Sequence, residues 1–575
     1  MIVIAALLAV LLGLPSFAIG FFLDDYHQIG LIEGWHDFEV PALNLYASFL
    51  DFPGVPWWTS PEARTGFWRP ISSATLRLDH ALFGRQAPLW HAHSLLWLAA
   101  LVAVVGLLYR YLPPPVGALA LLLFALDEAH AMTAGVLCNR HALATAVPAL
   151  LGLWAHLRWR EEGWRAGRLL SPLLFLLALG FGETTIPVMA YALAYELFAR
   201  HEAWPRRLAA IAPAAILAIA YVVAYSGFEL GPRGASFYIN PLEEPGRYAS
   251  ALALHVPALL AGGLAAFPAS LWMAGEALQA WLVAVGAISA LGLAAWCRQA
   301  WPSLPAGHRK ALAWCLGGAL GALPPLAAAP PSDRQLLVPA VGLSAVLAIL
   351  IERAWRARRA GTRVATAMAV LLLVLHGPVA SLSRVQTQLG TASLGDRLVE
   401  VVAGLELLGD RRPAHTPPVR FVVAYLPDFF TAVYPNAIWD FRRGPGTMRW
   451  HILTMAPVPQ ELVRTGPATL ELRAVEGRYL TSWSEQLLRA RGSVTEAGAE
   501  VETPGMRIRV LEVAPDPDAD GSPLPTALQF TFDQSLDAAP FRLVTWKGGR
   551  FELLDLPDPG GRLRLEPHPG LMGLL

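Results

Sequence analysis

The first two thirds of the chain consists of long apolar runs, whereas the last third does not. Up to about residue 381 the runs are separated by short polar or basic stretches, and from 382 to 575 apolar and polar positions alternate over short segments. An apolar helix of about 20 residues crosses the hydrocarbon core of a bilayer. The pattern therefore predicts a polytopic α-helical membrane region at 1–381 and a separate soluble domain at 382–575.

The apolar runs also predict individual helices. The run 169–198 is too long for one untilted span and has basic loops on both sides, so we expect a break at Gly182-Glu183-Thr184. Residues 250–268 are expected to be re-entrant or to lie on the membrane surface, because a full span there would put the basic loop 297–310 on the wrong side. We expect about eleven spans, which include the two halves of 169–198 and the runs 1–23, 93–112, 114–127, 141–157, 208–225, 279–296, 311–328, 335–351 and 364–381.

Basic loops orient these spans. The arginine-rich loops 158–168 and 352–363, together with Arg200, Arg206 and Arg207, are typical of the cytoplasmic side. The N-terminus is then inside and the C-terminal domain outside. In that orientation the polar groups of the membrane region all face the outer side: Asp24, Asp25, Arg69, His91, 127–130, Glu183 and Arg334. Ionisable residues at such depths are costly and usually pair with one another or form a site.

Composition narrows the class of protein. Charged residues make up 15% of the chain and hydrophobic residues 55%, whereas a soluble domain has roughly 25% charged residues. The formal net charge is zero, which gives no indication of nucleic-acid binding. Cys138, Cys297 and Cys315 all lie in or beside apolar runs, so the soluble domain has no disulfide framework.

The soluble domain is predicted to be α+β or mostly β. Alternating or buried apolar patterns at 419–426, 469–473, 506–511 and 528–532 favour strands, and 480–491 favours a helix. The domain contains no nucleotide fingerprint and no metal-ligand spacing. We expect a structural or acceptor-contacting role for it.

Asp24 and Asp25 stand where the first apolar run ends. Two adjacent carboxylates repel each other, and partial burial raises the pKa of at least one of them, which suits a general base near a membrane surface. The alternative is that both residues only stop the helix and mark the interface. The loop 24–91 that follows is rich in Trp and Pro and is expected to fold back on the membrane as short interfacial helices.

Three motifs follow one another in this part of the chain: Asp24-Asp25, Trp68-Arg69-Pro70 and Pro88-Leu89-Trp90-His91. In this order they resemble the GT-C class of glycosyltransferases, especially the protein O-mannosyltransferase-like members, including those with tetratricopeptide repeats. His130, Arg140, Glu183 and Arg334 stand in corresponding order, and the resemblance covers about residues 1–381. The chain departs from the family pattern at 127–128, where Asp-Glu replaces His-Pro, at Gly182, which replaces Lys, and at Ser94, which replaces Asn. No tetratricopeptide repeat follows.

The resemblance implies a GT-C-like fold and a membrane glycosyltransferase. Such an enzyme moves a sugar from a polyprenyl-phosphate donor to an acceptor hydroxyl of a protein, lipid or glycan on the outer face, with inversion. Asp24 and Asp25 would be catalytic, with Asp24 as the base. Donor phosphate and substrate would be bound by a second set: Arg69, His91, His130, Arg140, Glu183 and Arg334. No residue is assigned to a metal, a divalent cation is left open, and a bacterial inner membrane is the expected location.

Each of these residues also has a structural interpretation. Arg69 and Arg334 could pair with a nearby carboxylate such as Asp333, and Arg140 could extend to the interface. His91 and His130 could be hydrogen-bonded structural histidines at helix ends. For the whole chain, the alternatives are a catalytically inactive scaffold and a transporter or flippase of a lipid-linked substrate. A transporter usually has internal repeats with symmetric broken helices, and the sequence shows only one broken segment.

Overall fold

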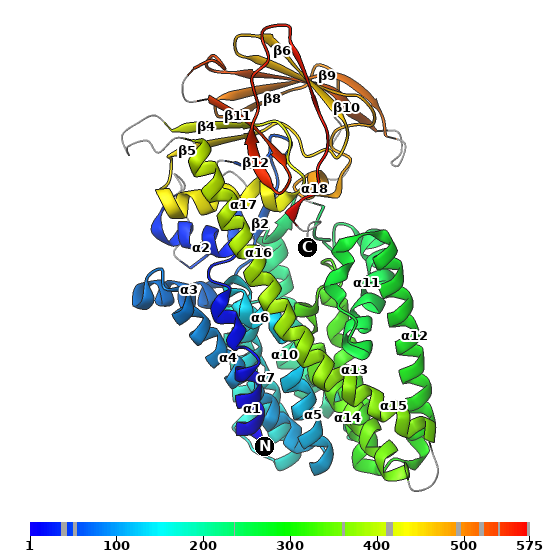
Figure 1. Cartoon of the computed structure of the whole chain (residues 1–575). Helices are drawn as coiled ribbons and strands as arrows, with labels where there is room; N and C mark the ends of the chain where they lie inside the picture. The colour runs from blue at the N-terminus through cyan, green and yellow to red at the C-terminus, as the bar shows by residue number, and fades with distance from the viewer. Residues whose placement is uncertain are drawn as a thin grey trace.

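The computed structural model is mostly helical up to residue 409 and mostly β after it (Figure 1). The structure describes residues 1–35, 43–49, 54–234, 236–358, 363–409, 418–489, 496–516, 522–538 and 541–571. Parts of several sequence expectations lie outside these ranges: 36–42 and 50–53 of the loop 24–91, 359–362 of the basic loop 352–363, and 490–491 of the expected helix 480–491.

The helices of the first part begin and end close to the apolar runs. They are α1 (Ile2–Leu11), η1 (Leu14–Ala18), α2 (Asp24–Glu33), α3 (Pro70–Phe83), α4 (Ala87–Leu108), η2 (Tyr109–Tyr111), α5 (Pro114–Leu126), α6 (His130–Gly135), η3 (Leu137–Asn139), α7 (Arg140–Glu162), α8 (Gly167–Phe181), α9 (Thr185–Ala194), η4 (Tyr195–Ala199), α10 (Trp204–Gly227), α11 (Pro245–Ala265), η5 (Ala269–Ala274), α12 (Glu276–Ala300), η6 (Trp301–Ser303), α13 (Ala306–Leu326), η7 (Asp333–Leu337), α14 (Pro339–Ala357), α15 (Arg363–Val374), η9 (Leu375–Val379) and α16 (Ala380–Leu408).

Two expectations about the first segments need correction. The run 1–23 is not one helix: α1 ends at Leu11, because Pro15 cannot donate an N–H to a continuing helix, and a short 3-10 turn follows. Asp24 and Asp25 therefore do not stop a helix but form the first turn of α2. Carboxylates are favourable there because the N-terminal end of a helix carries partial positive charge.

The later segments agree better with the sequence. The predicted break at Gly182-Glu183-Thr184 is confirmed, since α8 ends at Phe181 and α9 begins at Thr185. Residues 250–268 fall mostly in α11, which packs along α12 and is itself long and apolar enough to cross a membrane. The expectation that they are re-entrant or lie on the surface is therefore not confirmed. After α11 the chain turns back, so that Trp272 packs against His255 with ring centroids 5.0 Å apart.

Five helices in the described part of the chain are long and apolar enough to cross a membrane by length and composition: Ala87–Tyr111, Trp204–Gly227, Pro245–Ala265, Glu276–Ser303 and Arg363–Leu408. Shorter apolar helices accompany them at Ile2–Ala18, Pro114–Leu126, Gly167–Phe181 and Thr185–Ala199. The expected total of about eleven spans is not confirmed and stays a prediction. The expected boundary at 381/382 falls within α16, in the long helical stretch Arg363–Leu408.

The C-terminal part is β-rich, as expected. Its elements are β4 (Val419–Val423), α17 (Phe429–Arg443), β5 (Met448–Ile452), β6 (Gln460–Gly466), β7 (Thr469–Ala474), α18 (Trp483–Gln486), β8 (Glu500–Thr503), β9 (Met506–Pro515), β10 (Pro523–Phe532), β11 (Phe541–Lys547), β12 (Arg550–Leu553) and β13 (Arg562–Leu565). Within the described residues, the helix expected at 480–491 is reduced to α18.

Two sheets form this part. The antiparallel sheet has the order β13-β6-β7-β10-β9-β8, and the other sheet, β12-β11-β4-β5, pairs β11, β4 and β5 in parallel. A third, small sheet joins β1 (Ala47–Phe49), β2 (Arg64–Gly66) and β3 (Gly231–Arg233), so it ties the first loop to the chain after α10.

The β-rich part packs directly on the helical part. Figure 1 shows α17 beside α2, and their contact includes the ring of Phe441, whose centroid lies 5.2 Å from that of Tyr26. The Trp57 indole donates a hydrogen bond of 3.0 Å to the backbone carbonyl of buried Leu453. One hydrophobic core is therefore shared by α2, the end of α16 and both sheets.

The basic loops also gather, at the end of the helices away from the β-rich part (Figure 1). Ion pairs and hydrogen bonds connect the joints α7–α8, α9–α10, α12–α13 and α14–α15: Lys310–Glu161, Arg160–Glu202 and Arg353–Ser303. This arrangement puts these loops on one side, whereas their cytoplasmic location stays a prediction.

Replacement of Trp57 by Phe tests the shared core. Trp57→Phe leaves the Leu453 carbonyl without its donor and the ring site underfilled, which should cost about 2 kcal/mol of unfolding free energy. We expect a lower midpoint of thermal unfolding for the purified full-length protein. Trp281→Phe is the control, because Trp281 is 64% exposed on α12. Equal midpoints for both variants would contradict a core shared through Trp57.

Candidate functional site

Asp24 and Asp25 are adjacent but have opposite environments. Asp25 is 3% exposed, and its carboxylate accepts hydrogen bonds from the backbone N–H groups of Phe22 (2.9 Å) and Cys138 (2.7 Å). Asp24 is exposed and accepts a hydrogen bond of 2.7 Å from the Tyr434 hydroxyl. Of the two carboxylates, Asp24 is the one that a substrate can reach.

The backbone before Asp24 is strained. Leu23 has φ +49° and ψ −113°, a conformation that residues with a side chain rarely adopt and that persists where surrounding contacts hold it in place. The hydrogen bond from Phe22 N–H to Asp25 spans this residue, and Cys138 holds the same carboxylate from the other side. Asp25 thereby closes the turn that presents Asp24 outward.

Burial changes the titration of Asp25. Removal from water raises its pKa to about 7, and the negative charge of Asp24 acts in the same direction. The two backbone N–H donors favour the ionised form and lower the pKa, but they do not outweigh burial. Asp25 therefore exchanges a proton near neutral pH.

Arg334 lies next to this turn without a carboxylate partner among the described residues. Its Nη1 donates to the Asn139 side-chain oxygen at 2.7 Å, and Asn139 follows Cys138. The alternative that Arg334 pairs with Asp333 is wrong: the Asp333 carboxylate accepts instead from the backbone N–H groups of Ala269 and Ser270. A guanidinium has five N–H donors, so Arg334 keeps donors for an anionic ligand.

Arg69 is engaged with Glu183, as an ion pair at the broken helix. Its Nε donates to Glu183 Oε2 at 2.9 Å and a second nitrogen bonds the other carboxylate oxygen. The guanidinium lies over the rings of Tyr46 and Phe67, 4.9 and 4.4 Å from their centroids. Burial would raise the pKa of Glu183, but the charge and hydrogen bonds of Arg69 outweigh it and lower the pKa to about 2.

Tyr238, on the chain between β3 and α11, connects the two groups of charges. Burial raises its pKa, the charges of Arg334 and Arg69 lower it, and those of Asp24 and Glu183 raise it. All four charged side chains thus act on one phenol group. The structure therefore brings Asp24, Asp25, Arg69, Glu183 and Arg334 to one region.

The other expected site residues belong to the framework. His91, His130 and Arg140 are at most 1% exposed. His91 lies 2.8 Å from the Gly20 carbonyl and His130 lies 2.7 Å from the Phe124 carbonyl. Arg140 forms a buried ion pair with Asp79. Nothing in these contacts supports a donor-binding role, which stays a prediction for these three residues.

The sequence did not single out Tyr434, Tyr238, Asn139 or His141. Asn139 and His141 flank Arg140, and the helical turn points them elsewhere: the His141 ring packs against that of Tyr46, with centroids 5.3 Å apart. Inspection of the residues on both sides of Arg140 could have identified Asn139 and His141. Tyr434 had no local signal, because it comes from α17 in the C-terminal part.

Within the described ranges, no three His, Cys, Asp or Glu side chains come together in a way that could hold a metal ion.

Comparisons with known proteins give little further information. No family model matches the chain, and no curated protein matches it. Among the solved structures, the oligosaccharyltransferase of Archaeoglobus fulgidus in its apo form matches with a TM-score of 0.42 and 12% identity. The match covers 78% of this chain and 64% of that one, less than two thirds of its length. At this level the likeness carries no inference about function.

The raised pKa of Asp25 predicts how stability varies with pH. Because the pKa in the folded state is about 7 and the ordinary value is 3.8, the folded protein binds a proton more readily than the unfolded chain. Asp25 therefore stabilises the fold fully below about pH 4, and its contribution is lost as pH rises through 7. The loss is about 2–4 kcal/mol.

Thermal unfolding of the parent protein and of Asp25→Asn between pH 5 and 8 measures this effect. We expect the parent to lose more stability than the variant as pH rises. The difference between the two isolates Asp25 from all other groups. Parallel pH profiles would show that Asp25 does not titrate in this range.

Proposed function

We propose that this protein is a membrane glycosyltransferase that moves a sugar from a polyprenyl-phosphate donor to an acceptor hydroxyl. The observation that carries the proposal is that an exposed carboxylate and a cation reach the same short segment, Cys138-Asn139. Asp24 lies 4.0 Å from the Cys138 thiol, and Arg334, which has no carboxylate partner among the described residues, donates to Asn139. A transfer of this kind needs a base for the acceptor and a cation for the departing phosphate.

Asp24 is the base in this proposal. The acceptor hydroxyl gives its proton to the Asp24 carboxylate while its oxygen attacks the anomeric carbon of the sugar. The bond from that carbon to the phosphate oxygen breaks, and its electron pair leaves with the polyprenyl phosphate. Attack and departure occur on opposite faces, so the anomeric centre is inverted. Asp25 positions Asp24 through the Phe22 and Cys138 hydrogen bonds and does not touch the substrate.

Arg334 receives the phosphate. A planar guanidinium donates parallel charge-assisted hydrogen bonds to phosphate oxygens. Positive and negative side chains both act on the Cys138 thiol. Burial raises the pKa of the thiol, the charges of Asp25 and Asp24 raise it further, and those of Arg334 and Arg69 lower it. Arg69 contributes less to phosphate binding, because Glu183 already engages it on two atoms.

The surroundings suit a lipid-linked donor. The site lies where α1 and η1 give way to α2, and apolar helices of membrane length form the body below it. The β-rich part covers the other side through α17. A polyprenyl chain would lie along the apolar helices with its phosphate at Arg334, and the acceptor would approach from the β-rich side. The motif order Asp24-Asp25, Trp68-Arg69-Pro70 and Pro88-Leu89-Trp90-His91 is in keeping with this class.

Replacement of Asp24 tests the chemistry. Asp24→Asn keeps the shape and can still accept from Tyr434, but it cannot take a proton, so the transfer rate should fall by about 10²–10⁴-fold. Donor binding should be unchanged. The measurement is transfer or release of sugar from polyprenyl-phosphate sugars by the purified protein, with Asp396→Asn, another exposed carboxylate, as control. A parent transfer rate in well-folded Asp24→Asn would show that Asp24 is not the base.

Replacement of Arg334 should give the opposite pattern. Arg334→Gln loses the charge and is too short to keep the Asn139 hydrogen bond, so the dissociation constant for the donor should rise by about tenfold or more. Arg334→Lys should restore part of the affinity, because it returns the charge without the planar pair of donors. Direct binding of a labelled polyprenyl-phosphate sugar measures both variants. Unchanged affinity in Arg334→Gln would assign the phosphate to another cation.

A further inference from the structure

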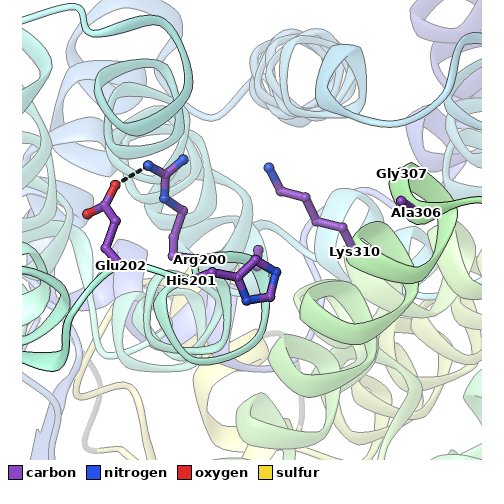
Figure 2. Close-up of a pocket in the computed structure, with 7 residues that line it drawn as sticks. Arg200, His201, Glu202, Ala306, Gly307 and Lys310 are labelled. Carbon is purple, nitrogen blue, oxygen red and sulfur yellow. Dashed lines mark hydrogen bonds and ion pairs between the residues drawn. The ribbon is translucent and has the colours of Figure 1, made fainter.

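A hollow of about 530 Å³ opens at the end of the helices where the basic loops gather. Figure 2 shows its lining: Arg200 and His201 come from the joint between η4 and α10, and Ala306, Gly307 and Lys310 come from the start of α13. None of these residues belongs to the site around Asp24. The hollow is therefore a separate feature of the helical part.

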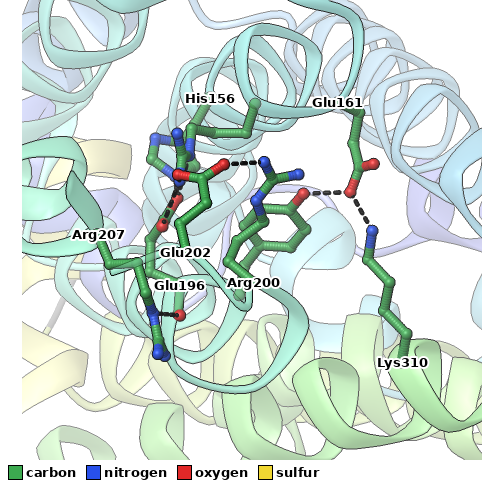
Figure 3. Close-up of polar contacts among 9 residues, drawn as sticks. His156, Glu161, Glu196, Arg200, Glu202, Arg207 and Lys310 are labelled. Carbon is green, nitrogen blue, oxygen red and sulfur yellow. Dashed lines mark hydrogen bonds and ion pairs between the residues drawn. The ribbon is translucent and has the colours of Figure 1, made fainter. Parts of the chain in front are cut away.

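The charges of the lining are mainly positive. Arg200 and Lys310 point into the same space in Figure 2, and Glu202 is the single carboxylate among the lining residues. Figure 3 shows that Glu202 holds Arg200 from one side and Glu161 holds Lys310 from behind. These carboxylates fix the two cations in place, and each cation retains N–H donors that they do not use.

A helix N-terminus in the hollow can also donate to an anion. Ala306 and Gly307 form the first turn of α13, a helix of 21 residues. The N–H groups of a first turn have no carbonyl partner within the helix, and the helix dipole favours negative charge there. The hollow thus combines two cations with a helix N-terminus.

The residues beside the hollow are those of a membrane interface. Trp204 and Trp301 are 57% and 42% exposed, and Phe198 is 52% exposed. Trp rings concentrate at the depth of the lipid headgroups. A π-helical turn, η4, leads into the hollow at Ala199, and such turns are frequent at functional sites. Exposed aromatic rings near the hollow are therefore in keeping with a position at the depth of the phospholipid phosphates.

We propose that this hollow binds the phosphate group of an anionic phospholipid from the adjacent leaflet. The phosphate oxygens accept from Lys310, from Arg200 and from the first-turn N–H groups of α13, and the acyl chains lie along the exposed apolar side chains near Phe198. A soluble phosphate is also an anion, but it would make no contact with the exposed apolar and aromatic side chains near the hollow. This proposal is independent of the proposed sugar transfer.

Native mass spectrometry of the full-length protein, released from vesicles of equal phosphatidylglycerol and phosphatidylcholine, tests the proposal. We expect the parent to retain phosphatidylglycerol and Lys310→Gln to retain about tenfold less. His201→Glu is a second variant that avoids a folding defect, because His201 is exposed, and the negative charge that it places in the lining should lower retention by about tenfold. Arg298→Gln, an exposed arginine in the last turn of α12, is the matched control and should behave like the parent.

Two results would overturn the proposal. Equal phosphatidylglycerol retention by the parent and both hollow variants would show that the lipid binds elsewhere. Displacement of phosphatidylglycerol by inorganic phosphate at equal concentration would show that a soluble phosphate is the occupant. Sugar transfer is not measured in this experiment, so its outcome does not depend on the proposed function.

Discussion

The arrangement of the candidate site depends on one buried carboxylate. Asp25 accepts from the backbone N–H groups of Phe22 and Cys138, so it joins the end of the first segment to η3, which is distant in sequence. A buried carboxylate is costly unless hydrogen-bonded, and here two backbone donors offset part of that cost. The same bonds hold Leu23 at positive φ and leave Asp24 facing outward. They also fix Asn139, the partner of Arg334, next to Cys138.

This geometry separates two roles that adjacent aspartates could share. Burial keeps Asp25 away from substrates and raises its pKa to about 7. Asp24 is exposed; its Oδ1 accepts from Tyr434, and its Oδ2 lies 4.0 Å from the Cys138 thiol. The same logic separates the arginines. Arg140 and Arg69 are buried and each has a carboxylate partner, Asp79 and Glu183, so both are less accessible to a phosphate than Arg334.

The β-rich part is a component of the site and of the core. Tyr434 reaches Asp24 from α17, and Trp57 reaches back to Leu453 in the opposite direction. The loop after α2 and the end of α16 contribute to the same hydrophobic core as the sheets. Such an interface holds α17 rigidly over the turn at Asp24, which a flexibly tethered domain would not do. The enclosure on this side of the site is therefore built from both parts of the chain.

Sequence alone determined the features that depend on local pattern. The apolar runs predicted most helices of the first part, because a helix in an apolar medium needs apolar side chains along its whole length. The break at 182–184 followed from the length of the run 169–198 and from the basic loops on both sides of it. The alternating segments gave the β-rich part. Pro15 indicates that the first helix ends early, and the preference of carboxylates for helix N-termini indicates that a new helix begins at Asp24. The continuous hydrophobicity of residues 1–23 favoured a single helix instead.

Tertiary structure alone decided which charged residues are engaged. The partners lie far apart in the chain: 114 residues separate Arg69 from Glu183, 195 separate Asn139 from Arg334, and 410 separate Asp24 from Tyr434. Hydropathy and periodicity carry no information about such contacts, because an ion pair depends on distance in space and not on spacing in sequence. The sequence could therefore name the charged residues, and only the fold could show that Asp25 is buried, that Arg140 is paired with Asp79, and that Arg334 has no carboxylate partner in the described part of the chain.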